Sequence, residues 1–338
     1  MAAYAVVNSF QGAFGPPTRG HYEGMLLAAQ KTLEQYPEGN ILMLYMPTCG
    51  SSAKPHLLDT MDARIECLSL FCAKLKAEFR GSNADRIFFE PSTIEYDLYR
   101  RTEVLGEAKP DKDTATYWTL KTLKNTYPDS TICLTMGLDN LFDLPFWKNV
   151  GTYPTYVTGK IYVLGRAVKP IDAQRTETVE GIAAQSNSGS KPLRFHKYAS
   201  WHAKYKDGSI VNAPIDGSDL AVKLETLYPI LSHIDFVMLA TPPPTSSSLL
   251  RVALIKYYGE KTQKYASAIK TLTGFDPVPL DADPSEDPWF KTFAIAAKYE
   301  KPDDIASFNA DYAKAFPSSG GKRSSRRSKR TGRKTYRY

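Results

Sequence analysis

Short apolar runs alternate with helix-compatible stretches along this chain, and this alternation most constrains the fold. The strand-like runs are Tyr4–Val7, Asn40–Met46, Arg86–Glu90, Thr131–Thr135, Lys160–Leu164 and Ile234–Ala240. The early ones are separated by helix-compatible stretches at Gly20–Tyr36, Thr60–Phe79 and Asp113–Thr126. Such alternation predicts βαβ units and a parallel sheet that binds ligands at the carboxyl ends of its strands. We therefore expect an α/β fold with a Rossmann-like, doubly wound parallel sheet.

The rest of the chain divides into three further segments. Residues 167–233 are polar and read as an insertion into a main domain that spans residues 1–258. This insertion either lies over the site or is surface decoration, because long loop insertions are tolerated easily. A helical C-terminal region follows at residues 259–317, and the Gly/Ser/Lys/Arg-rich segment 318–338 is expected to be disordered. The helices expected after the last strand are Leu249–Tyr258, Thr262–Leu272, Trp289–Tyr299 and Ile305–Phe316.

The basic character of the chain belongs to its tail. The formal net charge is +7, but residues 318–338 hold nine Lys or Arg and no acid, so residues 1–317 carry −2. The tail either binds nucleic acid or an import receptor, or it is a solubilising end without a dedicated partner. The apolar runs are far shorter than a membrane span, so no membrane partner is expected.

The four cysteines, Cys49, Cys67, Cys72 and Cys133, show no CxxC spacing and lie in or beside apolar runs. This scatter predicts reduced, buried thiols and argues against a zinc site. The N-terminus lacks a charged segment followed by an apolar one, so no signal peptide is expected. We therefore expect an intracellular protein, cytoplasmic or nuclear, with no metal ligands of its own; a homo-oligomer is left open.

The loop at residues 12–21, Gly-Ala-Phe-Gly-Pro-Pro-Thr-Arg-Gly-His, follows the first strand and leads into a helix. A strand, a glycine-rich turn and a helix start form a layout that can hold a nucleotide phosphate. Gly12 lets the backbone approach a ligand, and His21 can donate a hydrogen bond to a phosphate oxygen. From spacing alone, a phosphate-binding loop and an ordinary strand–helix loop with an incidental histidine are equally supported.

Two motifs taken together favour the phosphate-binding loop. Thr18-Arg19-Gly20-His21, preceded by Gly-x-Phe-x-Pro, resembles the T/HxGH signature of the nucleotidylyltransferase superfamily. Ser246-Ser247-Ser248-Leu249-Leu250-Arg251 is similar to the second signature of that superfamily, SSTxxR, and also follows an apolar run. The resemblance implies a nucleotidylyltransferase fold.

Within the superfamily, the intervening stretches most resemble nicotinamide mononucleotide adenylyltransferase. The Gly-x-Asp at 137–139 and the Trp-Lys at 147–148 are similar to that family, as is the strand at 161–166 that ends in arginine. There are two departures: Ile94 stands where the family has a tryptophan that sandwiches nicotinamide, and Pro242-Pro243-Pro244 replaces the usual Asn-Asp. Both departures put the acceptor nucleotide in question.

The resemblance also implies an ATP site. His21, Arg251 and Thr18 are the expected catalytic residues, with His21 stabilising charge on the phosphates and Arg251 binding the β- and γ-phosphates. A magnesium ion bridging the phosphates is implied, held mostly by ATP and water. Asp139 either accepts from the ribose hydroxyls or only caps a helix. The complete set of expected ATP-binding residues is Gly12, Ala13, Phe14, His21, Gly137, Asp139, Ser246, Ser247, Ser248 and Arg251.

The expected acceptor-binding residues are Lys54, Ile94, Tyr96 and Trp147. By resemblance, Lys54 meets the acceptor's phosphate, although most single lysines are solvated. Trp147 either stacks on the acceptor's base or is a core tryptophan. Tyr96 is expected to replace the missing stacking ring, or the nicotinamide is held on one face only.

The sequence therefore predicts an enzyme that joins ATP and nicotinamide mononucleotide to give NAD and pyrophosphate. The acceptor could instead be nicotinate mononucleotide, phosphopantetheine or another phosphorylated compound. A rival of a different class is an inactive nucleotide-fold protein that associates with nucleic acid through its basic tail.

Overall fold

The computed structural model describes residues 4–49, 56–100, 116–137, 140–141, 144, 147, 149–165, 177–178, 201–204, 210–213, 234–240, 242 and 247–296. The expected helix at 305–316 and the tail at 318–338 lie outside these residues. The strands are β1 (Val6–Gly12), β2 (Ile41–Pro47), β3 (Ile87–Pro91), β4 (Thr131–Gly137), β5 (Lys160–Leu164), β6 (Glu177–Thr178), β7 (Trp201–Lys204), β8 (Ile210–Ala213) and β9 (Asp235–Leu239). The α-helices are α1 (Arg19–Gln35), α2 (His56–Asp59), α3 (Met61–Glu78), α4 (Ser82–Arg86), α5 (Ile94–Arg100), α6 (Thr116–Thr126), α8 (Tyr153–Tyr156), α11 (Ser247–Leu254), α12 (Ala266–Thr273) and α13 (Pro288–Ala296). Shorter turns of helix are η2 (Val150–Thr152), η4 (Ile255–Gly259), η5 (Gln263–Tyr265) and η6 (Pro284–Glu286).

A six-stranded sheet in the order β3-β2-β1-β4-β5-β9 forms the centre of the molecule. All five strand pairs are parallel, with Val6 of β1 level with Ile41 of β2 and Thr131 of β4. The order reverses between β1 and β4, as in a doubly wound sheet, whose ligands bind at such a switch point. The expected Rossmann-like parallel sheet is confirmed. The short strands β6, β7 and β8, within residues 167–233, form a separate sheet.

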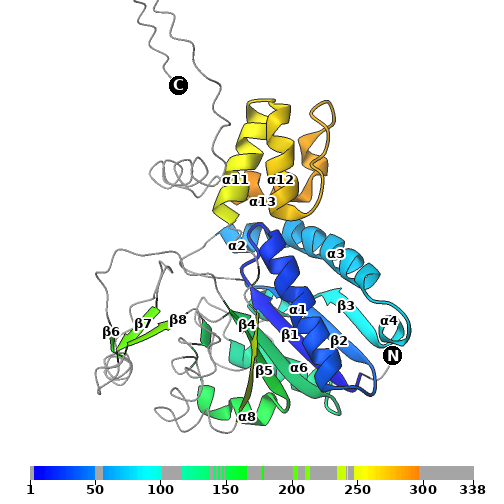
Figure 1. The fold of residues 1–338 in the computed structure, drawn as a ribbon, viewed down its shortest axis with the longest axis vertical. Coiled ribbons are helices and arrows are strands. Elements are labelled where there is room, and N and C mark those ends of the chain that lie inside the picture. The colour runs from blue at the N-terminus through cyan, green and yellow to red at the C-terminus, as the bar shows by residue number, and fades with distance from the viewer. Residues whose placement is uncertain are drawn as a thin grey trace, which may run out of the picture.

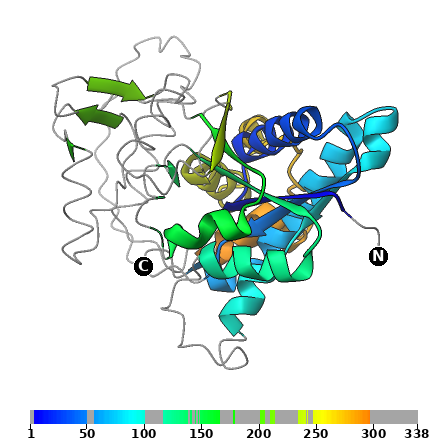
Figure 2. The same cartoon turned by 90° about the horizontal axis from the view of Figure 1, so that it is seen from below.

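The sheet is buried on both faces because its strands are apolar at successive positions. On β2, alternate residues enter two different cores: Ile41, Met43 and Tyr45 one, and Leu42, Leu44 and Met46 the other. Helices α1 and α3 cover the first core, and α6 and α8 cover the second, on opposite sides of the sheet (Figure 2). Continuous apolar runs of this kind are typical of parallel strands covered by helices on both faces.

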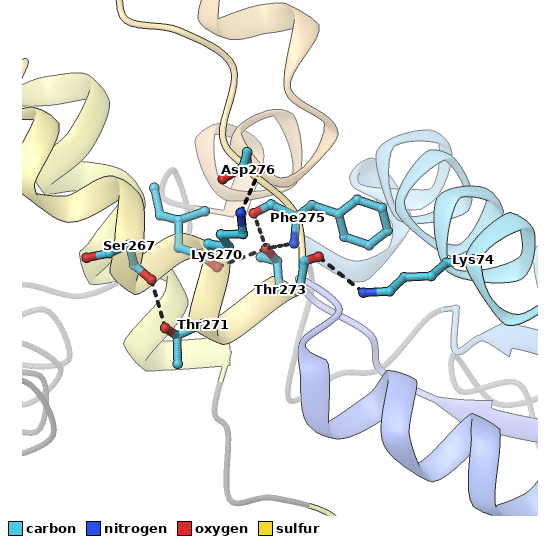
Figure 3. Close-up of polar contacts among 9 residues, drawn as sticks. Lys74, Ser267, Lys270, Thr271, Thr273, Phe275 and Asp276 are labelled. Carbon is cyan, nitrogen blue, oxygen red and sulfur yellow. Dashed lines mark hydrogen bonds and ion pairs between the residues drawn. The ribbon is translucent and has the colours of Figure 1, made fainter. Parts of the chain in front are cut away.

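The C-terminal helices α11, α12 and α13 gather at one end of the molecule, next to α2 (Figure 1). The predicted helical C-terminal region is thus confirmed over its described part. Lys74 of α3 holds this region in place: its Nζ donates to the Gly274 carbonyl over 3.2 Å and lies 4.9 Å from the Tyr22 ring centroid and 5.1 Å from that of Phe275. Figure 3 shows Lys74 reaching from α3 toward the turn after α12.

The sequence located the long elements well and missed the short ones. The strand predicted at Tyr4–Val7 begins at Val6 and runs on to Gly12, so it is longer than predicted and ends where the glycine-rich loop begins. Helices α2, α4, α5 and α8 were not predicted, because each spans seven residues or fewer and shows no helical period. All four cysteines are buried, as expected, and burial raises the pKa of the Cys72 thiol to about 12. Within the described part of the chain, no helix has the length and apolarity needed to cross a membrane.

Candidate active site

The loop from Gly12 to Thr18 joins β1 to α1 at the carboxyl end of the sheet. Phe14 takes a positive φ of 43° and its side chain is buried, packing edge-on against the His21 ring at 5.1 Å. A Cβ at Gly12 would lie 3.1 Å from Cζ of Phe14, so glycine lets this ring fold back over the strand end. Because the Phe14 side chain faces the core, only its backbone remains for the predicted ATP contact.

Thr18 and His21 are linked at the start of α1. Thr18 is the N-cap residue, and its backbone N–H donates to Nδ1 of His21 over 3.0 Å. The Thr18 hydroxyl oxygen lies 2.9 Å from the same nitrogen. Since Nδ1 accepts a backbone hydrogen bond, the proton of the neutral ring is on Nε2. His21 therefore carries its N–H donor on the nitrogen that is remote from the cap.

The second motif contacts this loop directly. Arg251 of α11 donates from Nη2 to the Gly15 carbonyl over 3.0 Å, and Ser247, the first residue of α11, donates from its hydroxyl to the Pro16 carbonyl over 2.8 Å. The two stretches are more than 230 residues apart in the chain. The fold thus brings Ser247 and Arg251 against the loop that leads to Thr18 and His21.

Arg64 supports the same loop from α3. It is fully buried and donates from Nη1 to the carbonyls of Ala13 (2.7 Å) and Thr48 (3.0 Å) and from Nη2 to that of Leu57. Burial lowers the pKa of Arg64 to about 10, and the neighbouring Cys49 and Glu95 offset part of that shift.

Trp289 of α13 is a loop contact that the sequence missed. Its Nε1–H donates to the Pro17 carbonyl over 2.8 Å, and its side chain is only 4% exposed. No motif marks this residue, because its partner lies 272 positions away in the chain.

Gln11 is a second residue that the sequence missed. It lies beside Gly12 at the end of β1, and its Oε1 accepts from the Thr116 hydroxyl over 2.9 Å. Its Nε2 is buried without a hydrogen-bond partner among the described residues. A buried donor of this kind at a strand end is suited to a ligand that would satisfy it.

Two of the expected acceptor residues lie on the face of the sheet that α6 and α8 cover. Ile94 and Trp147 both pack at the edge of the core that α6 and α8 cover, and Trp147 is half-buried with its ring centroid 6.3 Å from that of Tyr153. The Tyr96 ring has the Arg100 guanidinium 5.3 Å from its centroid, so one of its faces is already occupied. Lys54, Asp139, Ser246 and the Ser248 side chain lie outside the described residues. Gly137 ends β4, the neighbour of β1, which places it beside Gly12 at the same edge of the sheet.

A cavity of about 360 Å³ lies elsewhere, between α3 and β3. It is lined by Cys72, Lys76, Phe89 and Glu90 among others, and includes none of the predicted site residues. Its cation, Lys76, already donates to the Ile87 carbonyl over 2.8 Å. The loop is a better candidate site than this cavity, because it combines two motifs and buried donors at a switch point of the sheet.

The fold and the loop define an α/β protein with a Rossmann-like parallel sheet. Side chains of its C-terminal helices donate hydrogen bonds to the loop after the first strand. The sequence matches no protein family model and no curated protein. Solved structures similar to the chain include nicotinic acid mononucleotide adenylyltransferase from Plasmodium falciparum, solved with APC and with NaAD. It has 15% identity and a TM-score of 0.38, and the match covers 91% of this chain and 100% of that one.

Two other solved structures are similar. A protein described as a nicotinate-nucleotide adenylyltransferase from Vibrio parahaemolyticus has 19% identity and a TM-score of 0.28, over 46% of this chain and 71% of that one. Tyrosyl-tRNA synthetase from Leishmania major, in complex with tyrosinol, has 12% identity and a TM-score of 0.28, over 93% of this chain and 44% of that one. Because every TM-score is below 0.5, the functional proposal rests on the residues of the site.

Proposed function

We propose that this protein is an adenylyltransferase that joins ATP to a phosphorylated pyridine nucleotide, with nicotinamide mononucleotide as the acceptor. One observation carries the proposal: Ser247 and Arg251 of the second motif donate hydrogen bonds to the loop that leads to His21. In the same loop, the Thr18 N–H donates to Nδ1 of His21. Two unrelated stretches of sequence that resemble the two halves of one phosphate-binding site meet at the carboxyl end of a parallel sheet. That is where a doubly wound fold binds nucleotides.

In the proposed reaction, a phosphate oxygen of the acceptor attacks the α-phosphorus of ATP. The bond from that phosphorus to the bridging oxygen breaks, and pyrophosphate leaves with the electron pair. No covalent intermediate with the protein is needed, so positioning and charge stabilisation supply the catalysis. ATP enters as its magnesium complex, with the ion held by phosphate oxygens and water.

The proposal gives a defined part to His21, to Arg251, to the start of α11 and to Gln11. His21 donates from Nε2–H to an α-phosphate oxygen as negative charge builds there. The guanidinium of Arg251 is planar and positively charged, which suits binding of the β- and γ-phosphates, and its Nη2 also donates to the Gly15 carbonyl. The first amides of α11, at and after Ser247, favour the same anions. Gln11 offers a buried donor to the nucleotide.

The acceptor is the least constrained part of the proposal. Nicotinate mononucleotide differs from the amide form by a carboxylate, and phosphopantetheine has no pyridine ring. The decisive experiment mixes purified protein and magnesium–ATP with each of these acceptors and follows pyrophosphate release, with identification of the adenylylated product. Pyrophosphate release with none of them would overturn the proposal, and preference for nicotinate mononucleotide would correct the acceptor alone.

A second candidate function rests on the tail. Nine basic residues within residues 318–338 suit phosphate contacts with nucleic acid. In this alternative the nucleotide fold is inactive, and the same acceptor panel decides, because an inactive fold yields no product with any acceptor.

A further inference from the structure

One peptide group next to the proposed catalytic histidine is hydrogen-bonded on both of its sides. Its carbonyl, that of Pro17, accepts from Nε1–H of Trp289 over 2.8 Å. Its N–H, that of Thr18, donates to Nδ1 of His21 over 3.0 Å. A peptide group is planar and rigid, so a donor that sets the direction of the carbonyl also sets the direction of the N–H.

We infer that Trp289 is a positioning residue for His21, acting through the Pro17–Thr18 peptide group; the inference rests on the proposed function. The indole holds the peptide plane, and the N–H of that plane holds Nδ1 of His21 as an acceptor. The ring proton is thereby kept on Nε2, the nitrogen that donates to the phosphate in the proposed reaction. Hydrogen bonds in such a chain also polarise one another, because the accepting carbonyl strengthens the N–H of the same group as a donor.

Trp289 is itself held rigidly, as a positioning residue must be. Its backbone N–H donates to Oδ1 of Asp287 over 2.9 Å, and Oδ2 of that buried carboxylate accepts from the Tyr258 hydroxyl over 2.6 Å. Tyr258 lies in η4, which continues α11. The helix that carries Arg251 and the helix that carries Trp289 are thus linked to each other as well as to the loop.

Ring packing fixes the indole from its other sides. The Trp289 ring centroid lies 5.1 Å from that of Phe275 and 5.9 Å from that of Phe71 on α3. Phe275 follows the turn that Lys74 holds, and its ring lies on the α3 side of that turn in Figure 3. The indole packing alone requires no N–H, since these neighbours are apolar rings. The hydrogen bond to Pro17 is therefore separable from the packing, and a variant can remove the one and keep most of the other.

The test is Trp289→Phe, which removes the N–H donor and retains an aromatic ring on α13. We expect kcat for adenylyl transfer to fall by about 10-fold while KM for ATP changes by less than about twofold, since the loss concerns orientation and not ATP binding. Nitrogen-15 spectra of the His21 ring, recorded without substrate at a pH where the ring is neutral, should show the Nε2–H tautomer in the wild type. The variant should show a mixture of both tautomers.

Phe275→Leu is the matched control. It loosens the packing on the same indole but leaves the N–H and its acceptor in place. We expect a lower melting temperature, a kcat within about twofold of wild type and an unchanged His21 tautomer. If this control lowers kcat as much as Trp289→Phe does, Trp289 acts only through packing and the inference is wrong.

The spectra separate failure of this inference from failure of the proposed function. They need no substrate, so they are informative even if the protein transfers no adenylyl group. If Trp289→Phe does not fold, the wild type decides: a His21 ring protonated on Nδ1, or a Trp289 indole N–H that exchanges rapidly with solvent, overturns the inference. Wild-type kcat and tautomer in a folded Trp289→Phe variant overturn it as well.

Discussion

His21 obtains its orientation from its place in the first turn of α1. As the third residue of the helix it faces back toward the N-cap, where the Thr18 N–H meets Nδ1 over 3.0 Å. The Phe14 ring supports it from the side at 5.1 Å. A local cap therefore determines which ring nitrogen can donate to a ligand.

His21→Ala should lower kcat by about 100-fold or more with a modest change in KM for ATP, because the lost donor acts mainly on the transition state. Steady-state kinetics on the purified variant measure this. Lys31→Ala, near the other end of α1 and part of a surface ion pair with Glu34, is the control and should keep wild-type rates. A His21→Ala enzyme within a few-fold of wild type would remove His21 from the mechanism.

Trp147 packs at the edge of a core and is also an expected acceptor-binding residue. It is half-buried at the edge of the core that α8 covers, with the Tyr153 ring centroid 6.3 Å away, so one part of the indole packs and another remains accessible. This position fits a ring that stacks on an acceptor base while it also closes a core.

Trp147→Ala should weaken acceptor binding by about 1–2 kcal/mol, with ATP affinity little changed, since the stacking contact concerns the acceptor alone. Separate titrations of the two substrates by calorimetry measure both affinities. Equal losses for acceptor and ATP would instead identify Trp147 as a structural residue.

At the scale of elements, α3 connects the sheet to the C-terminal helices. Arg64, near the start of α3, holds the Ala13 carbonyl, and Lys74, two to three turns later, holds that of Gly274. Phe71, between them, packs on Phe275 with ring centroids 5.8 Å apart. One helix thus sets the distance between the loop at residues 12–18 and the region that carries Trp289.

Lys74→Met should destabilise the protein by about 1–2 kcal/mol, because the Gly274 carbonyl loses its donor and two rings lose their cation. Urea unfolding measures the change in the free energy of unfolding. Lys31→Met, which also exchanges a lysine for an apolar chain of similar length, should change it by less than about 0.5 kcal/mol. Similar values for the two variants would mean that Lys74 does not hold the C-terminal helices.

At the scale of the whole molecule, the positive charge and the residues that hold the loop occupy different parts of the sequence. Residues 1–317 carry a formal charge of −2, and the nine basic residues of the tail account for the positive total. The contacts that hold the loop come from Arg64, Ser247, Arg251 and Trp289, all of which precede the tail.

Truncation after Pro317 should therefore leave adenylyl transfer unchanged. Binding of DNA or RNA by the full chain, if measured, should disappear with the tail and weaken steeply as salt rises, because it would depend on phosphate contacts. Activity assays and fluorescence anisotropy at two salt concentrations check both points. A truncated protein that loses its rate would place part of the catalytic unit beyond residue 317, and undiminished nucleic-acid binding would locate the basic surface on the folded body.

The sequence by itself determined the class of fold and where the site begins. Strands such as Lys160–Leu164 and the helix that starts near Gly20 were predictable, because apolar periodicity and cap residues act within a few positions of the chain. The loop before His21 and the serine-rich stretch at 246–248 were singled out by their resemblance to two known motifs, because spacing alone did not distinguish them from an ordinary loop and an ordinary helix cap. Short helices such as α2 and α5 were not predictable, since they form where neighbouring elements pack and not from their own propensity.

Only the tertiary structure decided how the loop is held. The carbonyls of Ala13, Gly15, Pro16 and Pro17 each accept from a side chain of another element, and these donors lie between 51 and 272 positions away. Tertiary structure also turned Phe14 into the core, although the sequence counted it among the ligand contacts. The physical reason is the same in each case. A buried carbonyl must have a donor and a buried ring must fill space, but which distant residue meets either need depends on how the helices pack around the sheet.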